Sequence, residues 1–600
     1  MIKIIKYLTL SAFCVAGSIC LADLHNPFDA LPASTFGAAR LDVSSESHEE
    51  WRRETELGQL IFSDEKIESY KAMVEELADT SDNFGQFVEE MESVGLSLED
   101  LYSLMESKIG FAVADIETEV GDKMPTIYFW AETEDGMAEK IFTSIVEEAA
   151  DSEGTIREDQ EIAGVPMSRI RDADTGSSFL VAQMANRFMF VIGMPRETAD
   201  LMNHGDKYEA AEESALGYFI QGQKEGEGGF REAFYGDEGI QNALPEGEQF
   251  LEIVGNIGSL IDLLPADEGM KLAPFGLDQF TKIGLWASMD GEGERTKFFV
   301  GAPEPRRGIT RLLELEPMEF QPPAWVPAEI SSYSVVGFSF EKFYEVAYEI
   351  AGGFLPQQMI DEQIESANSQ LGMMLQTDIE SIVKAFGNRV HMIEYPMLTQ
   401  TMDLGEGQSL EIPTESVAVV MDFDQPQLLD NAMAMFGGLM AQPGGGIGLL
   451  DELGYKGMRM DAAMTGQDIT FAYGGGKMIV SVGAGTDSKI FSAMNNPPEG
   501  EDALINDPKF RAFMEKYSPK QGTGFSYADG SKALQGLGNI FTQSLELLFA
   551  SEEGFPSELF DRFIELMPSE EELSATLGVI YSRSYHDEHG YVAETLNEFN

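Results

Sequence analysis

The stretch that decides the fold is FLVAQMANRFMFVIGMPRETADLMN, from Phe179 to Asn203, because a second stretch repeats it without gaps. That second stretch is ITFAYGGGKMIVSVGAGTDSKIFSA, from Ile469 to Ala493, and the alignment places Gly193 on Gly483. Both stretches have the pattern of a strand, a tight turn, a second strand and an amphipathic helix. Two such segments in one chain predict an internal repeat.

Four further segments match in the same order along the chain. They are Leu31–Val43 with Trp325–Phe338, Leu96–Val113 with Thr377–Ile393, Thr126–Phe142 with Ser416–Met433, and Ile283–Val300 with Leu577–Glu594. Consecutive strands joined by short turns favour antiparallel pairing. We therefore expect an α+β protein built from two tandem copies of a mainly antiparallel sheet, with helices packed on one face of each sheet.

Six prolines lie between Gly301 and Pro327, and proline cannot donate to a sheet ladder. This segment is typical of a surface connection between the copies. The expected division is a signal peptide over 1–22, a first repeat over 23–305, a proline-rich connection over 306–324 and a second repeat over 325–600.

The amino-terminal segment has the pattern of a secretory signal. A short basic stretch ending at Lys6 precedes the apolar range Tyr7–Leu21, and Ala22 is suited to cleavage. We expect an exported protein, periplasmic or extracellular. Both cysteines, Cys14 and Cys20, lie in the removable part, which leaves no disulfide, thiol nucleophile or cysteine ligand in the mature chain. No later stretch is apolar enough to predict an integral membrane segment.

The charge balance excludes one class of partner. The chain has 104 Asp and Glu against 39 Lys and Arg, a formal net charge of −65. Such a surface repels nucleic-acid phosphates and anionic lipid headgroups, so we expect no nucleic-acid partner. Divalent-cation uptake and adaptation to salt remain alternatives to a simple solvated acidic surface.

His586 and His589 have the spacing of two metal ligands, with two acids between them. The matching turn of the first copy, Asp290–Arg295, contains no histidine. The pattern therefore favours a polar turn tip, and we assign no metal site.

Five short motifs resemble catalytic or binding loops, but each lacks a required part. Ser63–Lys66 and Ser81–Asn83 resemble elements of penicillin-binding enzymes, but the Lys-Thr-Gly element is missing. Gly474–Met478 resembles the end of a phosphate-binding loop but lacks a hydroxyl for magnesium, and Pro443–Gly448 precedes a possible helix but lacks the leading strand of a dinucleotide site. Asp172–Gly176 begins like a calcium loop but lacks its glutamate. We assign no catalytic residue, no cofactor-binding residue and no cofactor.

The ordered units LPASTFGAARLDV, LSLEDLYSLMESKIGFAV, AETEDGMAEKIF and FMFVIGMPRETADLM resemble those of a family of large exported bacterial proteins classed as a domain of unknown function. The resemblance covers most of both copies and rests on hydrophobic pattern and a few Gly and Pro positions. It implies an exported protein whose role is non-enzymatic or uncharacterised, and it brings no catalytic residues.

These observations lead us to expect an exported, non-catalytic binding or structural protein with a duplicated domain, whose partner is a protein, a peptide or a lipid. One alternative is a hydrolase that acts on envelope or extracellular polymers through a carboxylate pair. Another is a carrier of lipids or other hydrophobic ligands. Nothing in the sequence assigns an oligomeric state.

Overall fold

The computed structural model describes residues 27–599 except for 118–122, 174–177, 194–211, 222–228, 263–271, 441–446, 461–466, 534–561 and shorter gaps of one or two residues. The expected signal peptide lies outside this range. The chain forms two compact units. Unit 1 comprises 1–265, 281–301 and 549–567, and unit 2 comprises 266–280, 302–548 and 568–600.

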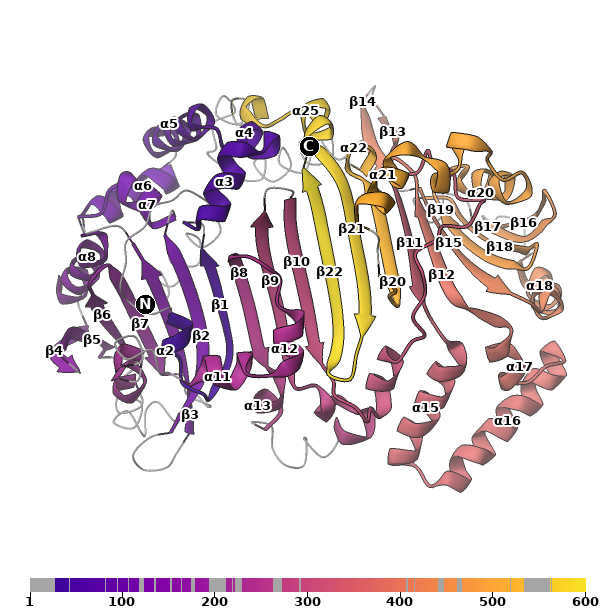
Figure 1. The fold of residues 1–600 in the computed structure, drawn as a ribbon, viewed down its shortest axis with the longest axis horizontal. Coiled ribbons are helices and arrows are strands. Elements are labelled where there is room, and N and C mark those ends of the chain that lie inside the picture. Colours follow the sequence, from indigo (N-terminus) through magenta and orange to yellow (C-terminus); the bar gives the residue numbers. More distant parts are fainter. Residues whose placement is uncertain are drawn as a thin grey trace. The chain divides into compact units, whose positions relative to one another are not determined.

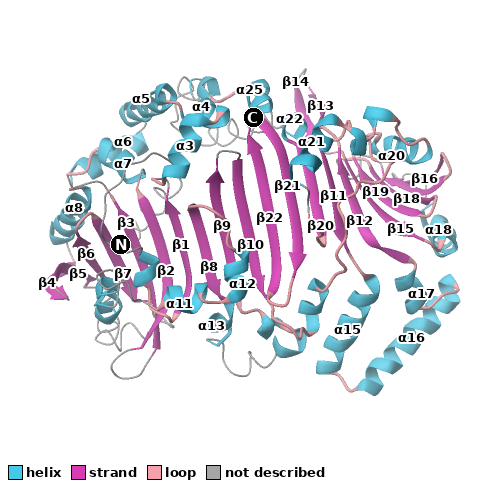
Figure 2. Ribbon diagram, viewed as in Figure 1, coloured by secondary structure: helices cyan, strands magenta, loops and turns pink. Residues whose placement is uncertain are grey.

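The described strands of unit 1 form an antiparallel sheet (Figure 2). They are β1 (Thr35–Asp42), β2 (Lys108–Glu117), β3 (Lys123–Glu132), β4 (Thr155–Ile162), β5 (Val165–Asp172), β6 (Ser178–Met184), β7 (Arg187–Gly193), β8 (Gln249–Asn256), β9 (Lys282–Asp290) and β10 (Gly293–Gly301). Pairing gives the order β4-β5-β6-β7-β3-β2-β1-β8-β9-β10.

Unit 2 also has an antiparallel sheet. Its strands are β11 (Ser332–Gly337), β12 (Phe386–Glu394), β15 (Val417–Phe423), β16 (Ile447–Glu452), β17 (Tyr455–Met460), β18 (Ile469–Gly474), β19 (Lys477–Val482), β20 (Gly524–Asp529), β21 (Leu577–His586) and β22 (Gly590–Phe599). Their order is β16-β17-β18-β19-β15-β12-β11-β20-β21-β22. A separate hairpin consists of β13 (Leu398–Gly405) and β14 (Gln408–Thr414).

Helices fill the connections between these strands (Figure 1). Those of unit 1 are α2 (Pro27–Ala30), α3 (Glu46–Glu54), α4 (Glu56–Phe62), α5 (Asp64–Thr80), α6 (Asp82–Ser93), α7 (Leu98–Met105), α8 (Met137–Asp151), α11 (Phe230–Tyr235), α12 (Glu238–Ala243) and α13 (Ile257–Asp262). Those of unit 2 are α15 (Phe340–Phe354), α16 (Gln357–Leu375), α17 (Ile379–Lys384), α18 (Pro426–Met440), α20 (Thr486–Asn495), α21 (Pro508–Tyr517), α22 (Gly530–Ala533) and α25 (Glu570–Thr576), with short 3-10 turns η1 (Ala273–Phe275), η2 (Leu277–Gln279), η3 (Gly308–Leu313), η4 (Gly500–Asp502) and η5 (Leu504–Asn506). Within the described residues, none of these helices is long and apolar enough to cross a membrane.

Helices pack on both faces of each sheet, so the prediction that they cover one face is wrong. In unit 1, α8 belongs to the cluster that contains Phe129 and Phe190. The next residue, Trp130, points to the other face, where the ring of Phe28 on α2 lies 6.1 Å away. In unit 2, α18 packs near Met421, whereas α20 packs with the preceding residue Val420. The reason is that these strands carry apolar residues in continuous runs, which need cover on both sides.

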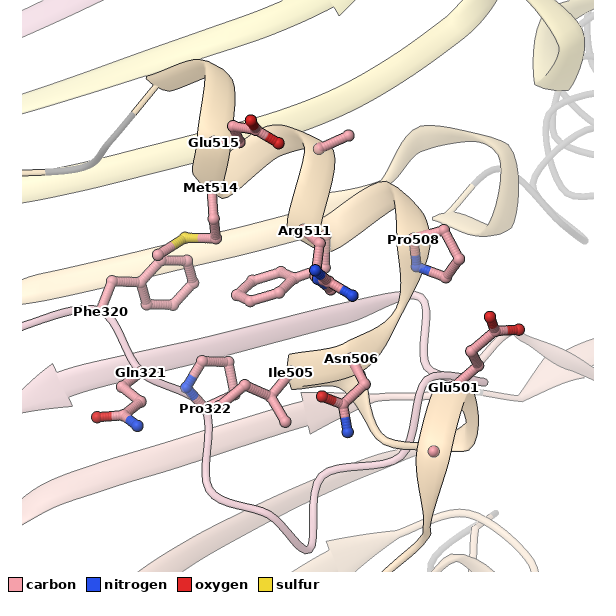
Figure 3. Close-up of a pocket in the computed structure, with 13 residues that line it drawn as sticks. Phe320, Gln321, Pro322, Glu501, Ile505, Asn506, Pro508, Arg511, Met514 and Glu515 are labelled. Atoms are coloured by element: carbon pink, nitrogen blue, oxygen red, sulfur yellow. The ribbon is translucent and has the colours of Figure 1, made fainter.

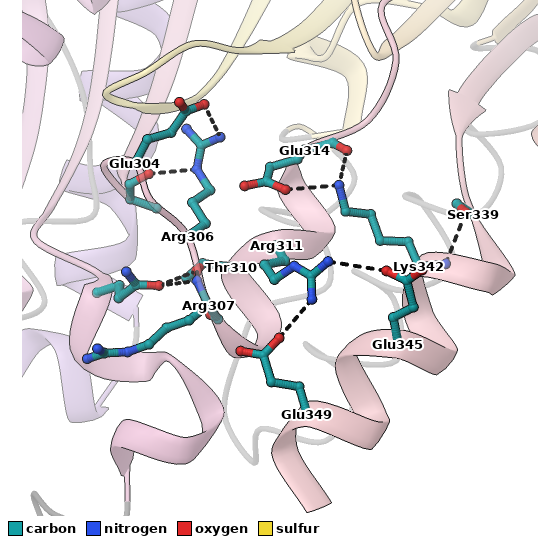
Figure 4. Close-up of polar contacts among 12 residues, drawn as sticks. Glu304, Arg306, Arg307, Thr310, Arg311, Glu314, Ser339, Lys342, Glu345 and Glu349 are labelled. Atoms are coloured by element: carbon teal, nitrogen blue, oxygen red, sulfur yellow. Dashed lines mark hydrogen bonds and ion pairs between the residues drawn. The ribbon is translucent and has the colours of Figure 1, made fainter. Parts of the chain in front are cut away.

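The proline-rich connection is an ordered part of unit 2 (Figure 4). Arg311 on η3 forms ion pairs with two acids of α15, Glu345 at 3.2 Å and Glu349 at 2.8 Å. Lys342 of the same helix bonds both the backbone carbonyl and, at 3.0 Å, the carboxylate of Glu314. These bonds fasten the segment after Gly301 to the helix that follows β11.

Candidate functional site

A groove of about 980 Å³ lies in unit 2, between the proline-rich segment and α21 (Figure 3). One wall is the segment Phe320–Pro322, and the other is formed by η4, η5 and α21. The two walls are joined where Val326 and Leu504 share a backbone hydrogen bond of 2.9 Å. The volume is at the upper end of the usual range for ligand pockets.

The floor of the groove is apolar and rigidly packed. Phe320 and Phe510 are buried, with ring centroids 5.7 Å apart in an edge-to-face arrangement. Phe320 also stacks on Phe525 of β20 at 5.0 Å, which ties the floor to the sheet. The half-buried side chains of Ile505 and Met514 complete the apolar surface. Because α21 turns Phe510 and Phe513 inward, its neighbouring residues Arg511, Ala512 and Glu515 are left on the exposed side.

The rim of the groove is polar. Gln321 and Asn506 offer amide groups, and Glu501 and Glu515 offer carboxylates. Arg511 is exposed, and within the described residues its side chain forms no hydrogen bond and no ion pair. Figure 3 shows its guanidinium between Phe320 and Pro508 in that view. The groove therefore combines an apolar floor with available donors and acceptors.

The described residues contain no cluster of three His, Cys, Asp or Glu side chains that would hold a metal ion. Seven described carboxyl groups have a lowered pKa, as in Asp529, where burial raises the pKa but hydrogen bonds from Ser531 and Lys509 together lower it further. A glycosidase-type general acid needs the opposite shift. The arrangement in the groove is suited to binding.

The histidine pair lies in a hairpin turn. His586 ends β21, and Asp587 accepts hydrogen bonds from the backbone N–H groups of His589 and Gly590 at 2.9 and 3.0 Å. Burial lowers the pKa of His586, which keeps its ring neutral near pH 7. Asp587 thus organises a polar turn, the structure favoured by the sequence.

The remaining motifs are scattered through turns and helices. Gly475 and Gly476 form the β18–β19 turn with φ of 58° and 77°, and Ser63 follows α4 directly. The glycine run Pro443–Gly448 leads into strand β16, so the helix expected after it is wrong; residues 443–446 themselves lie outside the described residues. Ser81 and residues 174–176 of the motif Asp172–Gly176 also lie outside them.

Sequence reasoning assigned no residue of the groove. Phe320 and Pro322 belong to the expected proline-rich connection, and Arg511 belongs to no motif. The signal that was present is the amphipathic pattern of Phe510, Phe513 and Met514 beside an isolated arginine. Nothing in the linear order joins positions 320–322 to 501–515.

Comparison with known proteins gives no assignment. No family model matches the chain, and no curated protein matches it. Two solved structures are similar to 49% of this chain. Crystal form III of TP0453 matches with 8% identity and a TM-score of 0.19, and 90% of that chain is covered. Crystal form I of TP0453 matches with 10% identity and a TM-score of 0.18, and 87% of that chain is covered. Similarity at this level carries no argument about function.

Proposed function

We propose that the protein is an exported, non-catalytic binding protein whose unit 2 groove holds an extended, apolar peptide segment with a neutral or positive charge. The observation that carries the proposal is the open groove of about 980 Å³, with the buried floor of Phe320 and Phe510 and the unpaired side chain of Arg511 at its rim. Export is supported by the pattern of the first 22 residues.

The polar rim favours a peptide over a purely hydrocarbon ligand. A peptide backbone presents alternating donors and acceptors, and the amides of Gln321 and Asn506 can pair with both. Arg511 can donate to the backbone carbonyl oxygens of the segment. Aromatic-lined grooves are a recurrent surface for extended peptides.

The charge of the ligand follows from the surroundings. Glu501 and Glu515 outnumber Arg511 on the groove, and the whole chain carries a formal charge of −65. The long-range field of such a surface accelerates the approach of cations and repels anions. We therefore expect basic segments to bind faster and more tightly than acidic ones.

We also propose that the two units are copies of one duplicated domain. Their strand orders correspond position by position. Leu180 pairs with Val191 in unit 1, and Thr470 pairs with Ser481 in unit 2. The offset along the chain from the first pair to the second equals the offset from Phe179 to Ile469 in the sequence alignment. One match needs adjustment. Gly255 on β8 and Ala528 on β20 hold corresponding places in the two sheets. Gly255 pairs with Ile283 and Ala528 pairs with Ile580, so strand pairing aligns Ile283 with Ile580 and not with Leu577.

An ion pair recurs at the corresponding place in both sheets. Arg187 of β7 pairs with Glu132 of β3 at 2.7 Å, and Lys477 of β19 pairs with Asp422 of β15. Features that both units share are explained by the common fold, and the groove lined by Phe320 and Arg511 lies in unit 2.

The test is binding of synthetic peptides to the full chain. Fluorescein-labelled hexapeptides with alternating leucines and either lysines or glutamates are titrated, and fluorescence anisotropy is recorded in 50 and 300 mM salt. We expect the lysine series to bind and to weaken with salt, since the attraction is electrostatic at long range. Arg511→Ala should weaken binding about tenfold, in line with the loss of a charged hydrogen bond of about 1.5 kcal/mol.

The matched control is Arg389→Ala, because Arg389 is another exposed arginine of unit 2, on β12. Loss of binding in both variants, or equal affinity for the lysine and glutamate series, would show that the groove does not select the ligand as proposed. Incubation of the full chain with purified peptidoglycan, followed by mass spectrometry, tests the hydrolase alternative, for which soluble cleaved fragments are expected.

A further inference from the structure

Strand β16 forms one edge of the sheet of unit 2 (Figure 1). Within the described residues it pairs with β17 and with no other strand. The two-residue turn between them, Leu453 and Gly454, has φ of 53° and 86°. In such a hairpin the residues that flank the turn exchange backbone hydrogen bonds, and bonded and non-bonded pairs then alternate along the two strands. The backbone N–H and C=O groups of Ile447, Leu449 and Asp451 therefore point away from β17, toward the edge.

The side chain of Leu449 ends an apolar row of the sheet. Residues directly opposite each other in antiparallel strands point to the same face. The row across β16, β17, β18, β19 and β15 consists of Leu449, Met458, Phe471, Val480 and Val419. On the inner strands the row is covered by α18, whose Leu428 and Leu429 lie in one cluster with Phe471. At the edge Leu449 is 72% exposed, so an apolar side chain placed beside it would continue the row.

The next position on the same face of β16 carries an acid. Asp451 is exposed, and within the described residues its carboxylate forms no ion pair. Lys456 lies directly opposite on β17 but is bound by Asp430 of α18 at 3.0 Å. Side chains on one face of a strand recur at every second residue, so a strand added beside β16 would bring neighbouring same-face residues to Leu449 and Asp451. A basic residue suits the second place, and the acid excess of the whole chain favours the same sign.

The edge strand at the corresponding place in unit 1 is protected by charge. Strand β4 comes first in the strand order of unit 1, as β16 does in unit 2. Its sequence is TIREDQEI, in which Arg157 pairs with Asp159 at 2.8 Å. Charged side chains on an edge strand oppose the addition of a further strand. The fold thus allows a protected edge at this place, whereas the stretch IGLL of β16 carries no charge.

We propose that β16 binds an extended segment of a partner protein by strand addition, with an apolar residue beside Leu449 and a basic residue beside Asp451. Each outward-pointing residue of β16 offers one backbone donor and one acceptor, which an extended segment satisfies in full. Antiparallel addition continues the pattern of the sheet, and it places the basic residue two positions before the apolar one. The site lies on β16 and is separate from the groove between Phe320–Pro322 and α21, so either can fail without the other.

A second copy of this chain is a poorer donor of the added strand. Two copies would bring a formal charge of −65 against another of −65, and such surfaces repel each other. Pairing β16 with β16 also leaves Asp451 without a basic partner in every register, because the sequence IGLLDE contains no lysine or arginine. A basic, apolar segment of another protein meets both requirements.

The experiment is a fluorescence anisotropy titration of the full chain with the labelled peptide Lys-Thr-Val-Thr-Val. In antiparallel addition its lysine lies beside Asp451 and its central valine beside Leu449. N-methylation of the central valine removes an N–H that bonds β16 and should weaken binding about tenfold. N-methylation of the first threonine is the control, because its N–H points away from β16, and the affinity should be unchanged.

Two variants of the chain test the edge from the other side. Leu449→Pro removes an outward N–H at a position where an edge strand tolerates proline, and it should weaken binding about tenfold. Asp451→Lys should weaken the lysine peptide and strengthen binding of the peptide with glutamate in its place. The matched control is Glu161→Pro on β4, an exposed edge residue of unit 1, and Arg511→Ala is the control for the groove. Both should bind like the parent chain.

Several results would overturn the proposal. They are no binding to the parent chain, equal affinity for the two N-methylated peptides, and unchanged affinity in both β16 variants that remain folded by circular dichroism. Should Leu449→Pro fail to fold, the charge exchange at Asp451 decides alone. Weakening by Arg511→Ala instead of the β16 variants would move the peptide to the groove. Light scattering is recorded in parallel, and a dimer abolished by the β16 variants would replace the segment by a second copy and equally refute the proposal.

Discussion

Acid should destabilise unit 2 through one buried histidine, His391 on β12. Its side chain is buried, its Nδ1 lies 2.8 Å from the hydroxyl of Tyr333, and the ring of Trp325 meets it edge-on at 5.9 Å. Burial lowers the pKa of His391 from 6.5 to about 4; Lys477 and Arg389 also lower it, and Asp422 opposes them. The native ring is therefore neutral at pH 5.

The magnitude follows from linkage. Below pH 6.5 the unfolded chain binds a proton at His391 that the native chain does not bind until pH 4, so the free energy of unfolding falls as pH falls through this window. With 1.36 kcal/mol per pKa unit, the loss is about 2 kcal/mol at pH 5 and about 3 kcal/mol at pH 4. Well above pH 6.5 the ring is neutral in both states and contributes no pH dependence.

The assay is urea unfolding of the chain labelled with fluorotryptophan, because ¹⁹F NMR separates Trp325 from the other three tryptophans. The reference variant is His391→Gln, which cancels the titration of the many carboxylates common to both chains. The quantity of interest is the difference in free energy of unfolding between the two chains at pH 7, 5 and 4. If that difference stays constant across the three pH values, His391 is not buried in a neutral form and the reasoning fails.

Two stability predictions follow from other contacts of the described residues, each with a control of the same type. Asp487 is buried and accepts hydrogen bonds from Arg459 and Thr470, both at 2.9 Å. Asp487→Ala should therefore lower the free energy of unfolding, measured by urea titration, by about 3 kcal/mol. The control is Glu380→Ala, in an exposed helical ion pair, which should lower it by under ~0.5 kcal/mol. Gly308 has φ of 55°, and an added Cβ would lie 2.2 Å from the carbonyl oxygen of Phe275. Gly500 has a similar φ of 60°, but the space around it is open, so an alanine there meets only about 1 kcal/mol of left-handed strain. Gly308→Ala should therefore lower the melting temperature far more than Gly500→Ala. Equal effects within either pair would contradict the packing described here.

Sequence reasoning predicted the hairpins well, because a hairpin is a local structure. The strand-turn-strand patterns from Phe179 and Ile469 are β6–β7 and β18–β19, with tight turns where expected. The α+β class and the antiparallel pairing are also confirmed. The prediction that helices pack on one face of each sheet was wrong. Apolar runs such as those in β6 and β7 are compatible with helices on one face or on both, so the pattern alone does not decide between the two arrangements.

The candidate groove was beyond sequence reasoning for a different reason. Its walls come from Phe320–Pro322 and from residues 501–515, which are brought together by the pairing of the sheet and by the backbone bond between Val326 and Leu504. His586 and His589, by contrast, are close in sequence and lie together in a single hairpin turn. Side chains that share a groove need not be close along the chain, as Phe320 and Arg511 show.

The sequence by itself determined the local elements of this protein: alternation and apolar runs specify strands, glycine and asparagine specify turns, and the acid excess specifies the long-range field. Only the tertiary structure decided the strand order, in which β3 lies between β7 and β2, and with it the rows that place Ala39 between Phe111 and Ile253. The physical reason is that strand pairing uses backbone hydrogen bonds that every residue can make, so the choice of partner depends on how all the side chains pack at once.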